Sequence, residues 1–391
     1  MKNRIFGIFV TVVFAVPFTF SMYINMAFAT TKYPQNNKER IPFIELKDSF
    51  IESSPSLSNS LTPNTSEIPS PSQNISLPTL PAASTAMPTP SIFPSPTSTP
   101  DTEKDPTQLN DEKIIVNVYD RETEQVVQMT LHDYLISVVA AEMPVTFELE
   151  ALKAQAVAAR TFTVKHMSSS CSGNSKAHVC TYYGCCQAYI SVDRMKKNWG
   201  NEFSLKFEKV RTAVESTDSL IMTYDNEPIT VFYFSTSNGY TEACQDVFVK
   251  NLPYYKSVES RGEENAPNFH SYVKISRKEF CNVLKTNFDI KINESSIEQS
   301  LDFKYTPGKR VAYVYFNGTP VKGTAFRTAF GLKSADFKFT FFDDYVLIDV
   351  CGYGHGVGMS QLGANAMAKN GETFDKIISH YYFDIQMTYV K

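Results

Sequence analysis

The stretch AEMPVTFELEALKAQAVAART, residues 141–161, separates two helical patterns with a single proline. The residues before it repeat apolar side chains at helical spacing and predict a helix over 131–142, which Pro144 stops. Glu142 therefore falls in the last turn, where the negative end of the helix dipole and the apolar neighbours both raise the pKa of a carboxyl group. A carboxyl that stays protonated near neutral pH can act as a general acid. A solvated glutamate at a helix end is the alternative interpretation.

Outward from this stretch, the sequence predicts short strands and short helices. Residues 113–120 and 126–131 alternate and predict a β-hairpin, and Thr146 is the predicted cap of the second helix. Further strands are predicted at SLIMTYD and PITVFYF around an Asp-Asn turn, and at VAYVYF and YVLIDV; two short helices are predicted over 360–370 and 374–381. We therefore expect an α+β fold with mixed, mostly antiparallel strands and several short helices, in two lobes around a substrate cleft.

The N-terminal part of the chain carries signals for location. Residues 1–30 begin with a basic tetrapeptide and continue almost without interruption as apolar or small residues, which predicts a transmembrane anchor. A signal segment cleaved after Ala27-Phe28-Ala29 is the alternative. Residues 31–111 are rich in Pro, Ser and Thr and predict a disordered linker. We expect a single N-terminal pass in the cell membrane, with residues 112–391 folded outside the cytoplasm.

The net charge and the cysteines indicate which binding partners and which metal site to expect. The net charge of −4 gives no indication of nucleic-acid binding. The chain has seven cysteines, so at least one is unpaired within the chain. The stretch HVCTYYGCCQAY, residues 178–189, places His178, Cys180, Cys185 and Cys186 at the short spacings of zinc ligands. A disulfide explains the same cysteines in an exported protein, and both interpretations stay open.

The stretch CGYGHGVGMSQLGANAMAKNG, residues 351–371, surrounds His355 with four glycines. Glycines allow unusual backbone angles and close approach of a ligand, which predicts a histidine held on a bare loop and not in a core. Ser360 and Gln361 follow at a predicted helix N-terminus, whose free N–H groups favour polar or anionic ligands. The alternative is a tight structural turn with an exposed histidine.

The stretch YFSTSNGYTEAC, residues 233–244, predicts a strand that ends in small hydroxyl residues and a glycine turn. Ser235, Thr236 and Tyr240 carry hydroxyl groups that can hydrogen-bond a sugar or a peptide. An ordinary hairpin tip explains the pattern equally well.

The segments AEMP…EALKAQAVAART, FSTSNGYTE and GYGHGVGMSQLGA together resemble the SpoIID/LytB family, over roughly residues 112–391. The resemblance implies a lytic transglycosylase that cleaves the MurNAc–GlcNAc bond of peptidoglycan and leaves 1,6-anhydro-MurNAc ends. It implies that Glu142 is the catalytic acid and base. Many relatives carry His where this chain has Phe234, so one substrate contact differs here. The positions that match the family's other site residues are Lys153, Arg160, Ser235, Thr236, His355 and Gln361.

The resemblance also extends to the cysteines. Cys180, Cys186 and Gln187 resemble a pattern of clostridial members, for which a structural zinc is implied and no cofactor is required for catalysis. Cys185 stands where a histidine is common, so a different ligand set is expected here.

The implied setting is sporulation engulfment. By family analogy, the partners are glycan strands, a sporulation amidase/endopeptidase that removes stem peptides to leave denuded glycan, and membrane engulfment proteins. The family also contains amidase enhancers, so a non-catalytic wall-binding enhancer in wall remodelling is the alternative. A metal-dependent wall hydrolase that uses His355 and His380 is disfavoured, because no HExxH-like spacing occurs.

Overall fold

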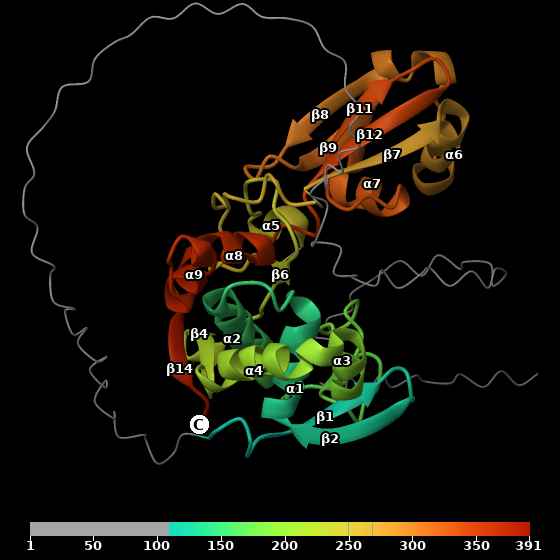
Figure 1. Cartoon of the computed structure of the whole chain (residues 1–391). Helices are drawn as coiled ribbons and strands as arrows, with labels where there is room; N and C mark the ends of the chain where they lie inside the picture. Colours follow the sequence, from blue (N-terminus) through green and yellow to red (C-terminus); the bar gives the residue numbers. More distant parts are fainter. Residues whose placement is uncertain (1–108, 249, 268) are drawn as a thin grey trace, which may run out of the picture. The chain divides into compact units, whose positions relative to one another are not determined.

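The computed structural model describes residues 109–248, 250–267 and 269–391 (Figure 1). The expected anchor over 1–30 and nearly all of the expected linker over 31–111 lie outside the described residues. Within the described part, no helix is both long enough and apolar enough to cross a membrane. The described chain contains both helices and strands, and the strands form mostly antiparallel sheets, which confirms the α+β class.

The folded region begins before the expected boundary at residue 112. The backbone N–H of Leu109 donates to the carbonyl of Val390 at 3.1 Å, and Asp111 is 1% exposed. Residues 109–111 therefore belong to the fold, and the boundary placed after them was wrong because composition does not reveal a single buried aspartate.

A first hydrophobic core combines the segment before residue 260 with the segment from Val357 onward. Its sheets have the strand orders β2-β1-β3, β14-β4-β5 and β13-β6. In chain order, its elements are β1 (Ile115–Asp120), β2 (Gln125–Thr130), α1 (Leu131–Glu142), α2 (Leu149–His166), β3 (Val179–Cys180), α3 (Val192–Trp199), η1 (Gly200–Glu202), α4 (Phe203–Glu215), β4 (Leu220–Tyr224), β5 (Glu227–Pro228), β6 (Tyr233–Phe234), α5 (Cys244–Val247), β13 (Met359–Ser360), α8 (Gln361–Lys369), α9 (Phe374–Tyr381) and β14 (Gln386–Tyr389).

A second core is formed by the segment between these two parts. Two antiparallel three-stranded sheets, β10-β9-β8 and β11-β12-β7, enclose a cluster of phenylalanine rings around Phe280, and α6 lies beside β7 (Figure 1). In chain order, the elements are β7 (His270–Ser276), α6 (Arg277–Phe288), η2 (Glu294–Ser296), η3 (Glu298–Ser300), β8 (Leu301–Tyr305), β9 (Val311–Phe316), β10 (Thr319–Lys322), α7 (Gly323–Ala329), β11 (Asp336–Phe341) and β12 (Tyr345–Cys351). The expected two lobes and the cleft between them stay predictions.

Helix α1 ends as the sequence predicts. The Thr130 side chain caps it by accepting the N–H of Asp133, and Glu142 is its last residue before extended Met143 and Pro144. Helix α2 differs from the expectation at its start. It begins at Leu149 without a side-chain cap, so Thr146 is not its cap; residues 144–147 form a turn instead.

The segment PITVFYF is not the continuous strand that its apolar residues predict. Asp225 and Asn226 form the expected turn with positive φ values of 51° and 63°, but β5 stops after two residues. The chain pairs again only at β6, which runs parallel to β13 with Tyr233 opposite Met359. Burial on both sides explains the apolar run without a strand. The β6–β13 pair joins the two quoted motifs that lie more than a hundred residues apart.

Candidate active site

Three donors from distant segments converge on the carboxyl group of Glu142. The backbone N–H of Ala188 donates to Oε1 at 2.6 Å, and the Tyr233 hydroxyl lies 3.2 Å from the same oxygen. The side-chain amide of Gln361 donates to Oε2 at 3.3 Å. Oε1 therefore has two partners and Oε2 has one longer contact. Oε2 is the oxygen better placed to carry a proton.

The surroundings of Glu142 favour the protonated form. Burial raises the pKa of this carboxyl, and the hydrogen bonds from Ala188, Gln361 and Tyr233 lower it by less. Tyr134 and Tyr233 are the titratable groups closest to it, and burial raises their pKa well above the ordinary value, so both stay neutral. The raised pKa inferred from the helix-end position is confirmed in direction, with burial as the leading cause.

A second layer of side-chain amides holds these donors. The Tyr233 hydroxyl has one proton, which it donates either to Glu142 or to Oε1 of Gln187 at 2.9 Å. The amide nitrogen of Gln187 donates to Thr163 at 3.3 Å. The amide of Gln361 also lies 3.5 Å from Oε1 of buried Gln155. The sequence identified Gln361 but missed the roles of Tyr233 and Gln187. Their neighbours had drawn attention, since Tyr233 opens the serine-rich segment and Gln187 follows the cysteine pair.

His355 is enclosed, in contrast to the bare loop that the sequence predicts. Its ring lies 5.8, 5.7 and 5.6 Å from the rings of Phe232, Phe234 and Phe248. Its Nδ1 accepts the N–H of Val357 at 3.1 Å. Burial lowers the pKa of His355 to about 3, helped by two nearby arginines, so the ring is neutral. His355 is half-buried beside these rings, so the loop is less bare than expected, and the glycine pattern also serves packing.

Two of the glycines show this packing directly. A Cβ atom at Gly356 would lie 2.6 Å from Cζ of Arg310, and one at Gly358 would overlap the carbonyl oxygen of Phe232. Both residues also have positive φ angles, of 86° and 80°, which other residues rarely adopt. The glycines therefore let the loop lie against its neighbours, and His355 is fixed between them.

The two basic residues expected in the cleft are both engaged within the protein. Arg160 is fully buried, and its Nε lies 2.8 Å from a carboxylate oxygen of Asp111. Its remaining N–H groups reach the carbonyls of Leu220 and Val214, so its expected place in the cleft was wrong. Lys153 forms an ion pair with Glu150 at 2.6 Å.

The hydroxyl residues of the serine-rich segment differ in accessibility. Thr236 is fully buried and pairs with Tyr353 in an isolated β-bridge, which makes it a structural residue. Ser235 and Tyr240 are half-buried, and Lys309 lies over the Tyr240 ring at 3.9 Å from the centroid. The structure brings Gln361 to Glu142 directly, and it links His355 to Glu142 through Tyr233, whose backbone hydrogen-bonds the imidazole.

Four cysteine sulfurs form a compact cluster. The Sγ atoms of Cys171, Cys180, Cys185 and Cys186 all lie within 4.8 Å of one another. The separations of 3.6 and 3.7 Å are far from the roughly 2.05 Å of a disulfide. Four sulfurs at about 2.3 Å around a tetrahedral zinc ion would lie about 3.8 Å apart. The cluster therefore fits a zinc ion.

The expected ligand set changes at one position. His178 is not in the cluster, because its Nδ1 accepts the backbone N–H of Asn117 at 3.1 Å. Cys171 takes the fourth place; it lies before the stretch 178–189 from which the ligands were predicted. The cluster ends two residues before Ala188, which donates to Glu142.

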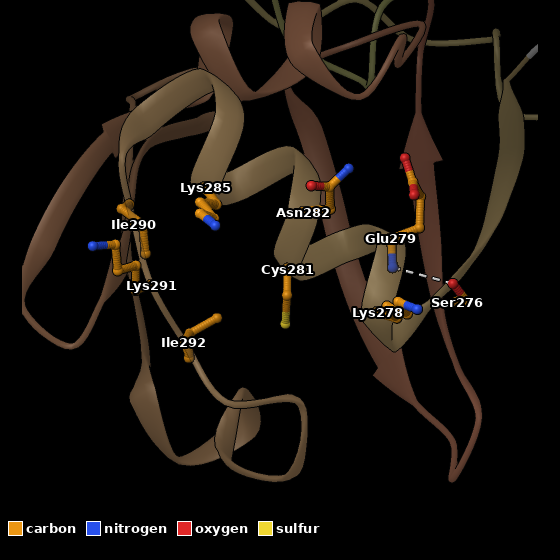
Figure 2. Close-up of a pocket in the computed structure, with 9 residues that line it drawn as sticks. All are labelled: Ser276, Lys278, Glu279, Cys281, Asn282, Lys285, Ile290, Lys291 and Ile292. Carbon is orange, nitrogen blue, oxygen red and sulfur yellow. Dashed lines mark hydrogen bonds between the residues drawn. The ribbon is translucent and has the colours of Figure 1, made fainter.

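A surface hollow of about 510 Å³ lies elsewhere, along α6 (Figure 2). Lys278, Lys285 and Lys291 line it together with Cys281. It shares no residue with the hydrogen-bond network around Glu142, so we assign it no part in the chemistry of Glu142.

The comparisons with known proteins agree with the motifs. The family model of stage II sporulation protein SpoIID matches residues 119–224, which include Glu142 and Gln187. Stage II sporulation protein D of Bacillus subtilis is 39% identical over 292 residues, which cover 74% of this chain and 84% of the relative. The chain belongs to the SpoIID family.

Two further relatives define the breadth of this family. Stage II sporulation protein D of Bacillus amyloliquefaciens is 38% identical over 72% of this chain and 80% of its own length. An amidase enhancer of Bacillus subtilis is 25% identical over 63% of this chain and 39% of its own length. In this SpoIID protein, Tyr233 and Gln361 lie outside the span of the family model, although they complete the network around Glu142.

Proposed function

We propose that the protein is a lytic transglycosylase that cleaves peptidoglycan glycan strands, with Glu142 as its only acid and base. The observation that carries this proposal is the carboxyl of Glu142, whose pKa is raised by burial and whose Oε2 has a single long contact. A protonated carboxyl with one oxygen free to donate is what cleavage of a glycosidic bond requires.

The reaction follows from that proton. Protonated Glu142 donates to the oxygen that joins N-acetylmuramic acid to N-acetylglucosamine, and the bond from that oxygen to muramic C1 breaks. Positive charge develops at C1. The Glu142 carboxylate then accepts the proton of the muramic C6 hydroxyl, and the C6 oxygen bonds to C1. The products are a free hydroxyl on one chain and a 1,6-anhydro end on the other, with Glu142 protonated again.

One carboxylate is sufficient for this reaction. Hydrolytic glycosidases use two carboxylates that flank the bond. Among the described residues, the hydrogen-bonding partners of Glu142 are a backbone N–H, a phenol and a side-chain amide, and none is a carboxylate. An intramolecular nucleophile has a high effective concentration and removes the need for a second one.

We assign substrate contacts to residues that keep accessible surface. Ser235 and Tyr240 are half-buried and carry hydroxyl groups suited to sugar recognition. Neutral His355 and Lys153 are the remaining candidates from the sequence. Thr236 and Arg160 are excluded because both are fully buried.

The proposed setting follows from the family. The protein would act in sporulation engulfment, held by an N-terminal membrane anchor with its catalytic domain outside the cytoplasm. It would act on denuded strands together with a sporulation amidase/endopeptidase and membrane engulfment proteins. A zinc ion on Cys171, Cys180, Cys185 and Cys186 would be structural, and we propose that catalysis needs no cofactor.

The test uses purified full-length protein and denuded glycan strands. The wild type is expected to release products with 1,6-anhydro-muramic ends, detected by mass spectrometry, and Glu142→Gln is expected to lower the rate about 10²- to 10⁴-fold. Glu215→Gln is the matched control, because Glu215 ends helix α4 as Glu142 ends α1 but is exposed. A Glu142→Gln variant with full activity would refute the proposal.

The same experiment addresses the alternative of a non-catalytic amidase enhancer, which one relative's name raises. An enhancer would release no anhydro product by itself and would increase the activity of an added amidase. It would do so equally well with Glu142→Gln.

A further inference from the structure

A second buried carboxylate, Glu263, lies behind the segments that contact Glu142. It is 1% exposed and lies between α5 and β7. Its Oε1 accepts the hydroxyls of Ser237 and Ser260 at 2.7 and 2.6 Å. Its Oε2 accepts the N–H of Ser237 and the hydroxyl of Ser360, both at 2.7 Å. All four lone-pair positions of the carboxyl group are therefore occupied, which fixes its orientation, while burial raises its pKa against the effect of these bonds.

Two of these partners belong to the segments that deliver the donors of Glu142. Ser237 lies four residues after Tyr233, and Ser360 directly precedes Gln361. Ser360 is also the cap of α8, since its Oγ accepts the N–H of Gly363 at 3.3 Å. Glu263 thus links the segment after β6 to the start of α8, in addition to the pairing of two residues between β6 and β13.

The side chains around Glu263 are tightly packed. The Ser260 hydroxyl, which donates to Glu263, also lies 2.8 Å from the hydroxyl of Tyr381 in α9. A Cβ atom at Gly363 would lie 2.7 Å from Oε1 of Glu263 and would overlap Ser260 and Tyr381. The glycine of the SQLGA motif therefore leaves the space that this cage occupies.

We infer that Glu263 is a positioning residue for the proposed acid, because it holds Tyr233 and Gln361 in contact with Glu142. This inference rests on the proposed function for its catalytic meaning, but the geometry it describes can be measured without substrate. A shift of either segment by about 1 Å would break the 3.2 and 3.3 Å contacts and is enough to cost about 100-fold in rate.

The direct readout is the pKa of Glu142. The hydrogen bonds from Tyr233 and Gln361 lower that pKa, so their loss raises it. The titratable groups that face Glu142, Tyr134 and Tyr233, stay neutral and contribute no step of their own near neutral pH. The titration is followed by carbon-13 NMR in the full-length chain with labelled glutamate, and the Glu142 signal is assigned by its absence from Glu142→Gln.

The expected result is a rise of about 0.5 to 1 unit in the pKa of Glu142 in Glu263→Gln, which keeps the side-chain shape but replaces an acceptor by a donor. Ser360→Ala removes the bond on the α8 side together with the cap of α8, leaves the bonds from Ser237 and Ser260, and is expected to give a smaller rise. Gly363→Ala disturbs the same cage without changing a polar group, and it is expected to act in the same direction. These two variants keep the test valid should Glu263→Gln fold poorly.

Asp111→Asn is the matched control. Asp111 is as buried as Glu263, and its carboxylate is bound by Arg160, but its side chain contacts none of the donors of Glu142. It is expected to lower stability and to leave the pKa of Glu142 in place. An unchanged Glu142 titration in folded Glu263→Gln, or an equal shift in Asp111→Asn, would overturn the inference.

The kinetics add a second readout on denuded strands. Glu263→Gln is expected to lower kcat about 10- to 100-fold with KM changed less than about threefold, since the substrate contacts remain. In the Gln361→Ala background its effect is expected to be smaller than in the wild type, because the part that acts through Gln361 is already lost. Additive losses would contradict the inference. Absence of anhydro products from the wild type would refute the proposed function alone, because the NMR titration needs no substrate.

Discussion

Replacement of Arg160 separates a structural role from the substrate-binding role that the motif implies. In Arg160→Met, the guanidinium that lies 2.8 Å from Asp111 is lost, and the Asp111 carboxylate stays buried without a counter-charge. The carbonyls of Leu220 and Val214 also lose their donors, which lie at 3.2 and 3.1 Å. Breaking a buried pair from one side costs about 3–5 kcal/mol. We therefore expect a loss of that size in the free energy of unfolding.

The assay is urea unfolding followed by the fluorescence of Trp199, the only tryptophan of the chain. Removing both charges in Arg160→Met with Asp111→Leu is expected to recover most of the loss, because no buried charge remains unpaired. Lowering the pH should also reduce the loss in the free energy of unfolding of Arg160→Met. Burial already raises the pKa of Asp111 and Arg160 opposes this rise, so without Arg160 the folded-state pKa lies higher. The penalty is full above that pKa and disappears as the carboxyl protonates.

Arg160→Lys tests geometry at constant charge. A lysine ammonium does not span the carboxylate and both carbonyls, so an intermediate loss is expected. The reasoning would be refuted if Arg160→Met kept wild-type stability while KM for glycan strands rose. That result would place the guanidinium in contact with substrate.

Three further predictions follow from the site. The kcat on denuded strands should fall as pH rises through the raised pKa of Glu142, and Tyr233→Phe should move this fall to higher pH in a pH–rate profile, because it removes a hydrogen bond that lowers the pKa. Acidification from pH 7 to 4 should lower the free energy of unfolding by roughly 2–3 kcal/mol through His355. Its pKa of about 3 leaves the ring neutral in the folded protein, while the ring binds a proton in the unfolded chain. In urea denaturation, the stability of His355→Gln should depend less on pH. Elemental analysis should find one zinc per chain, lost in Cys171→Ser and retained in His178→Ala, and retention by the former would contradict the four-cysteine site.

The sequence predicted the elements whose signals are local. Helix α1 begins at a threonine cap and ends before a proline, and both limits are confirmed at Leu131 and Glu142. Strand β9 is confirmed at Val311–Phe316, and helix α9 at Phe374–Tyr381. Apolar alternation, capping residues and breakers act within a few residues, so they can be read without knowledge of the fold.

The failures share one cause. Arg160 and Thr236 were expected near substrate because charged and hydroxyl groups are chemically capable. The structure buries both completely. Whether such a group contacts solvent depends on partners such as Asp111 and Tyr353. These partners lie far away in sequence, so the local pattern of apolar and polar residues cannot reveal them.

The network around Glu142 shows why a local signal in the sequence pointed to this glutamate but not to the groups around it. Its three donors lie 46, 91 and 219 residues further along the chain. The nearest donor follows the cysteine cluster, and the other two belong to the segments that Glu263 holds. A metal ion on the cysteines would therefore act on Glu142 through the position of a single backbone N–H. Glu142 is thus placed by one helix end and its pKa is raised by burial, while the hydrogen bonds that oppose this rise come from segments held elsewhere in the fold.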